Sequence, residues 1–117
     1  MSDDFLWIKI RQGLQIGVLS EEEVLECLAK LSMLELGQQI NHELHGEGGN
    51  PQIVRLIVEV LAPREDLSVD ELRCYLEVTH QKIRGGEEEE WKNVEKAIIE
   101  ALRMEHRKEL VTEYYRL

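Results

Sequence analysis

The 117-residue sequence has few cysteines and few aromatic residues, and it contains no long hydrophobic run. Because no stretch of about 18 apolar residues is free of charge, we expect no membrane span. Cys27 and Cys74 do not match a zinc or redox spacing, which predicts free thiols in a reducing cytoplasm. The first residues are acidic where a secretory signal carries positive charge, so we also expect no export.

Basic residues are scarce as well, with 14 Lys and Arg against 24 Asp and Glu and a net charge of −10. A chain of this charge repels phosphate backbones, so we expect no direct binding to nucleic acid. The opposite role is a hypothesis to keep: the acidic runs 21–23 and 87–90 would imitate a phosphate track. The protein would then be a decoy that occupies the basic groove of a nucleic-acid-binding protein.

Catalytic signatures are also missing from the sequence. It contains no G-x-S-x-G nucleophile motif, and its glycine-rich stretch "GEGGNP" follows a helical pattern where a nucleotide loop would follow a strand. We therefore expect no catalytic residue, no cofactor and no enzymatic activity. The motifs do not identify a family.

The sequence that remains, 43% hydrophobic and 32% charged, predicts a globular protein. We expect an all-α, single-domain bundle over residues 1–117, with about five helices and a long C-terminal helix. Ser20 with Glu23 and Ser68 with Glu71 have the spacing of capping boxes, which marks two helix starts. The first of these helices extends to Leu44, and its apolar positions drift in phase near Gly37, where we expect a kink or a break.

Two segments are ambiguous between helix and strand. Residues 5–19 form a helix if Gly17 ends it, or a hairpin about Gly13. Residues 52–62 follow Asn50 and Pro51, which suit an N-cap and a first helical position, but their β-branched run also suits a buried strand. We favour a helix for both.

The C-terminal quarter carries the predicted interaction surface. After a helix that ends at Gly85 and Gly86, residues 87–115 read as one long helix with a broad apolar stripe. A face this broad favours packing against several helices or against a second copy of the chain. The predicted interface residues are Trp91, Val94, Ile98, Leu102, Met104, Leu110 and Tyr114.

The stretch "NHELHG" raises the possibility of a metal site, because His42 and His45 are three residues apart. The simpler interpretation places both in the last turn of a helix that Gly46 ends, where the negative end of the dipole favours imidazole. Glu77 and His80 have the E-x-x-H spacing of bundle di-metal sites, but such sites use two pairs. We predict no metal ligand, and a metal-binding bundle that uses these four residues is the second alternative.

The leading hypothesis is therefore a small, acidic, non-enzymatic helical protein that acts through protein–protein contact. It would be a regulator, an adaptor or an assembly subunit in the cytoplasm, and it would bind a protein partner or form a homo-oligomer, such as a dimer, through its C-terminal helix.

Overall fold

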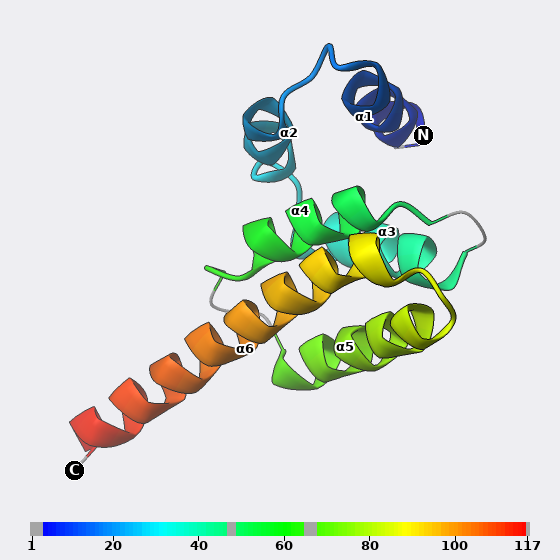
Figure 1. The fold of residues 1–117 in the computed structure, drawn as a ribbon. Helices are drawn as coiled ribbons and strands as arrows, with labels where there is room; N and C mark the ends of the chain where they lie inside the picture. Colours follow the sequence, from blue (N-terminus) through cyan, green and yellow to red (C-terminus); the bar gives the residue numbers. More distant parts are fainter. Residues whose placement is uncertain (1–3, 47–48, 65–67, 117) are drawn as a thin grey trace.

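The computed structural model describes residues 4–46, 49–64 and 68–116, and the side chains of Asp4, Glu88 and residues 107–116 lie outside that description. Within this part the chain forms six α-helices and no strand (Figure 1). They are α1 (Asp4–Ile16), α2 (Glu21–Leu28), α3 (Met33–His45), α4 (Pro51–Leu61), α5 (Val69–Arg84) and α6 (Glu88–Arg116). The all-α prediction is confirmed, with six helices where about five were expected.

The additional helix arises because the segment from Ser20 to Leu44 is divided at Ser32. The Ser32 hydroxyl accepts the backbone N–H of Glu35 at 3.1 Å, and Glu35 Oε1 accepts the backbone N–H of Ser32 at 3.3 Å. This capping box starts α3, so the break lies between α2 and α3. The break expected near Gly37 is wrong, because Gly37 lies inside α3 and one glycine costs a helix only about 1 kcal/mol.

Both ambiguous segments are helices. Helix α1 ends before Gly17, whose φ of +80° is the left-handed conformation that glycine adopts most easily. The carbonyl of Gly13 then accepts the N–H groups of Val18 and Leu19, both at 3.0 Å. At the start of α4, Asn50 Oδ1 accepts the N–H of Ile53 at 3.2 Å, and Pro51 occupies the first turn.

Helix α4 lies at the centre of the core. It packs against α2, α3 and α6, and this enclosure explains why its sequence is apolar around most of its circumference. Its buried residues are Ile53, Val54, Leu56, Ile57, Val58 and Leu61. The β-branched residues that suggested a strand therefore reflect burial on several sides.

Helices α5 and α6 form an antiparallel pair joined at Gly85 and Gly86, as the sequence predicted (Figure 1). Gly86 has a φ of +102°, which requires glycine at this turn. The N-terminal part of α6 packs against α4 and α5, whereas its C-terminal end extends beyond the other helices and contributes to overall dimensions of 52 × 33 × 25 Å. Among the described residues, no helix is long and apolar enough to cross a membrane.

Candidate functional site

The "NHELHG" stretch is the end of a helix. Helix α3 ends at His45, and the N–H of Gly46 donates to the carbonyl of His42 at 2.8 Å. Both histidine side chains are exposed, while Glu43 between them is 1% exposed. The helix-end interpretation of the histidines is confirmed, and the buried residue of this stretch is the glutamate.

Glu43 is the centre of a hydrogen-bond network that joins three parts of the chain. Arg11 Nη2 of α1 donates to both carboxylate oxygens, at 2.7 and 2.6 Å. Gln39 Nε2 donates to Oε2 at 3.0 Å, and the backbone N–H of Asn50 donates to Oε1 at 3.1 Å. A buried carboxylate needs such partners because burial otherwise disfavours its charge strongly.

Sequence reasoning missed Glu43, although a signal was present. Glu43 follows Leu36 by seven residues and Ile40 by three, so it falls on the stripe that α3 buries. An acidic residue on an apolar stripe predicts a buried ion pair. The partner, Arg11, is 32 positions away, and only the fold brings it close.

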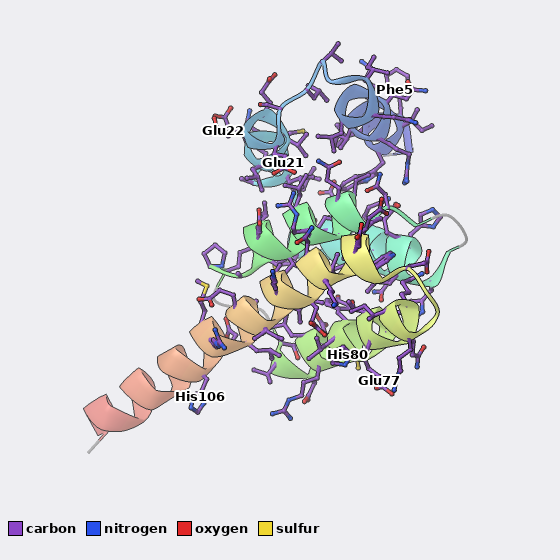
Figure 2. All side chains as sticks on the ribbon, viewed as in Figure 1. Phe5, Glu21, Glu22, Glu77, His80 and His106 are labelled. Atoms are coloured by element: carbon purple, nitrogen blue, oxygen red, sulfur yellow. The ribbon has the colours of Figure 1, made fainter. Side chains whose placement is uncertain are left out.

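The E-x-x-H pair of α5 does not form a metal site with other residues. His80 Nε2 lies 2.7 Å from Glu95 Oε2 of α6, and Glu77 is exposed, as Figure 2 shows for both labelled side chains. Among the side chains that the structure describes, no cluster of three or more His, Cys, Asp or Glu could hold a metal ion. His42, His45, Glu77 and His80 are therefore not brought together.

The acidic runs proposed for a decoy have partners within the chain. Glu21 accepts a hydrogen bond from Gln52 Nε2 at 2.8 Å and pairs with Arg55. The Gln52 hydrogen bond lowers the pKa of the Glu21 carboxyl most, and Arg55 adds to the effect while partial burial opposes it. Glu23 caps α2 with Ser20. Glu90, in the second run, is exposed. Decoy activity stays a prediction.

The interface predicted on α6 divides into three parts. Trp91, Val94 and Ile98 are at most 1% exposed and belong to the core of this chain. Leu102 and Met104 are half-buried against that core. Leu110 and Tyr114 lie outside the described side chains. Residue spacing identified the apolar stripe but does not distinguish internal packing from contact with another chain.

Exposed apolar side chains gather at the other end of the molecule. Four of the five large hydrophobic residues that are exposed in the described part lie within residues 5–18, and Leu34 on α3 is the fifth. We call these four the α1 patch: Phe5, Ile8, Ile16 and Val18, which are 64%, 51%, 72% and 67% exposed. Figure 2 places Phe5 on α1 at the opposite end of the molecule from His106 on α6.

The α1 patch lies on a helix whose other face is buried. Trp7 and Ile10 are at most 5% exposed and belong to the core. Lys9 Nζ lies 4.6 Å from the centre of the Phe5 ring, which is within the range of a cation–π contact. Residues 5–19 contain Lys9 and Arg11 and no carboxylate. This end of the molecule therefore combines apolar surface with positive charge.

Comparison with known proteins adds no relative: no family model matches the chain, and no curated protein or solved structure matches it.

Proposed function

We propose that this protein is a small non-enzymatic interaction protein, a regulator, adaptor or assembly subunit, that associates with a second copy of itself. The α1 patch is the observation that carries the proposal. Its four side chains are each at least half exposed. Together they present roughly 400 Å² of apolar surface, which is the size of patches that mark interaction sites on monomers.

The charge distribution favours a second copy at this surface. Two chains of charge −10 repel one another, and the repulsion is weakest where residues 5–19 carry two cations and no carboxylate. A symmetric contact buries the same patch on both copies. The apolar area then doubles to roughly 800 Å², and with a polar rim it approaches the lower limit of specific interfaces, which indicates a weak dimer.

The C-terminal helix remains the alternative surface for self-association. Trp91, Val94 and Ile98 already pack inside this chain, so a contact through α6 would use the part of the helix from Leu102 onward. Leu110 and Tyr114 have helical spacing in that part of the sequence. The experiment below distinguishes this surface from the α1 patch.

The proposal includes a cytoplasmic location and a protein partner. Cys27 and Cys74 are both free, and Cys74 is exposed, which suits a reducing compartment. The net charge of −10 argues against direct contact with nucleic acid.

Sedimentation equilibrium over a concentration series up to the millimolar range tests self-association. We expect the wild-type mass to rise toward that of a dimer, and Ile8→Glu to keep the protein monomeric. Leu34→Glu is the matched control, because Leu34 is 70% exposed on α3 and lies outside the α1 patch. It should associate like the wild type. Circular dichroism should show that both variants keep the wild-type fold.

Two further results would change the proposal. A loss of association in Leu110→Glu, with Ile8→Glu unaffected, would move the contact from the α1 patch to α6. A wild-type protein that is monomeric at every concentration would contradict self-association. Added salt should strengthen the dimer by screening the repulsion between two acidic chains, whereas an acidic decoy would lose its basic partner as salt rises.

A further inference from the structure

A polar cavity of about 620 Å³ lies where α1, α4 and α6 meet. Helix α1 contributes Arg11 and Gln15 to its wall, and α4 contributes Gln52 and Arg55. Helix α6 completes the wall with Glu90 and Asn93. The volume is within the range of small-molecule sites, about 300–1,000 Å³. Side chains from three helices thus converge on one space.

The two guanidinium groups of the cavity are held in place by residues outside its wall. Arg11 uses Nη2 for Glu43, while Arg55 uses Nη1 for Glu59, at 3.0 Å, and Nη2 for Glu21. Within the described residues, Nε and Nη1 of Arg11 and Nε of Arg55 have no acceptor. These N–H groups remain available, and their ion pairs restrict where they point.

The wall also carries a negative charge and several carboxamides. Glu90 on α6 is exposed, and no described group pairs with it. Asn50, at the N-terminus of α4, joins Gln15, Gln52 and Asn93 in the wall. Carboxamides both donate and accept hydrogen bonds, so they suit a ligand that has both kinds of group. Cations on α1 and α4 thus share the cavity with an anion on α6.

This arrangement restricts the charge of a ligand. Glu90 and the net charge of −10 disfavour a simple anion, while Arg11 and Arg55 disfavour a simple cation. A ligand with one group of each sign satisfies both sides. We propose that the cavity between α1, α4 and α6 binds a small zwitterion, a free amino acid or a short peptide, whose carboxylate contacts Arg11 and Arg55 and whose ammonium group contacts Glu90.

A neighbouring cavity extends the same surface along α4 and α6. It has a volume of about 490 Å³ and shares Arg55 and Asn93 with the first, adding Glu59 and Lys96. A single amino acid fills a fraction of the combined space, whereas a short peptide uses more of it and brings backbone amides to the carboxamides. Comparison of amino acids with peptides therefore distinguishes the two kinds of ligand.

The test is a nuclear magnetic resonance titration of the full chain with individual amino acids and with triglycine. We expect saturable shifts of the side-chain amide signals of Asn93 and Gln15. The matched probes are an N-acetyl amino acid, which lacks the ammonium group, and an amino acid amide, which lacks the carboxylate. Each should bind about tenfold more weakly than the zwitterion, because one charge-assisted contact is lost.

Variants on α6 assign the site. Glu90→Gln should weaken zwitterion binding about tenfold and narrow the difference between the zwitterion and its N-acetyl analogue. Glu89→Gln is the control, because Glu89 is also exposed on α6 but does not line the cavity. Absence of binding up to millimolar concentration, equal binding of the N-acetyl analogue, or equal weakening by both variants would overturn the inference. None of these outcomes depends on self-association.

Discussion

Helices α1 and α4 are both apolar, yet the fold uses them differently. In α4, Ile53, Val54, Leu56, Ile57, Val58 and Leu61 are all buried. In α1, Trp7 and Ile10 are buried, while Phe5, Ile8 and Ile16 are exposed. Helix α4 lies among α2, α3 and α6, whereas α1 lies at one end of the molecule (Figure 1).

The difference shows that apolar content alone does not define a core helix. A helix that is apolar around its circumference is either enclosed by neighbours or leaves one face for contact with another molecule. Helix α4 is enclosed, and α1 has a face without a neighbour in this chain. The same composition therefore stabilises the monomer in one helix and, in our proposal, supports association in the other.

Matched isoleucine truncations should give the largest contrast between the two helices. Ile57 is 0% exposed and Ile8 is 51% exposed. Ile57→Ala should lower the free energy of unfolding by about 2–5 kcal/mol, because it leaves a cavity in the core. Ile8→Ala should change it by less than about 0.5 kcal/mol in the monomer. Urea denaturation at low protein concentration measures both, and equal losses would mean that α1 is packed as tightly as α4.

The next largest effect concerns the ion pair that ties α1 to α3. Arg11→Met should cost about 3 kcal/mol, because the Glu43 carboxylate, 1% exposed, loses its counter-charge. Glu43→Gln should cost less, about 1–2 kcal/mol, because the Arg11 side chain it leaves is 34% exposed and can be hydrated. A double-mutant cycle by urea denaturation measures the coupling. A coupling near zero would show that apolar contacts alone hold α1.

The contrast between α1 and α4 also marks how far the sequence could be interpreted. Local signals located most helices: Ser20, Asn50 and Ser68 each accept the N–H that a capping residue should accept. The capping box of Ser32 with Glu35 was equally local and was overlooked. Contacts between distant residues were beyond prediction, because the pairing of Arg11 with Glu43 depends on how α1 packs on α3.

The candidate sites follow the same division. The helix-end position of His42 and His45 depends on neighbouring residues and was predicted correctly. The polar cavity depends on side chains from α1, α4 and α6, which no spacing in the sequence connects. Burial of Trp91, Val94 and Ile98 in the core likewise depends on the presence of α4 and α5. Periodicity identifies a face but not what covers it.

Two helical glycines provide a smaller comparison. A Cβ at Gly13 in α1 would overlap the side chain of Leu19, whereas a Cβ at Gly37 in α3 would meet no atom within 4 Å. Gly13→Ala should therefore destabilise the protein by about 1 kcal/mol, even though alanine favours helix. Gly37→Ala should stabilise it by about 0.5–1 kcal/mol. Thermal unfolding measures both, and a gain at Gly13 would mean that Leu19 moves aside easily.

The smallest effect concerns the contact between α2 and α4. The Gln52 hydrogen bond and the Arg55 charge lower the pKa of Glu21 below its ordinary value of 4.5. A lowered pKa in the folded state means that the contact stabilises the protein above pH 4.5 and that this stabilisation disappears as pH falls through the folded-state pKa. Glu21→Gln should therefore be less stable than the wild type near neutral pH, by under about 1 kcal/mol because the pair is partly exposed.

The pH dependence separates this ion pair from a simple loss of packing. Urea denaturation of Glu21→Gln and the wild type should give converging stabilities as the pH is lowered below 4.5, since the protonated wild-type carboxyl then resembles the amide. Glu22→Gln, at an exposed neighbouring position, should show no such convergence. If the difference at Glu21 persisted in acid, the contact between α2 and α4 would depend on shape and hydrogen bonding alone, as the apolar core of α4 does.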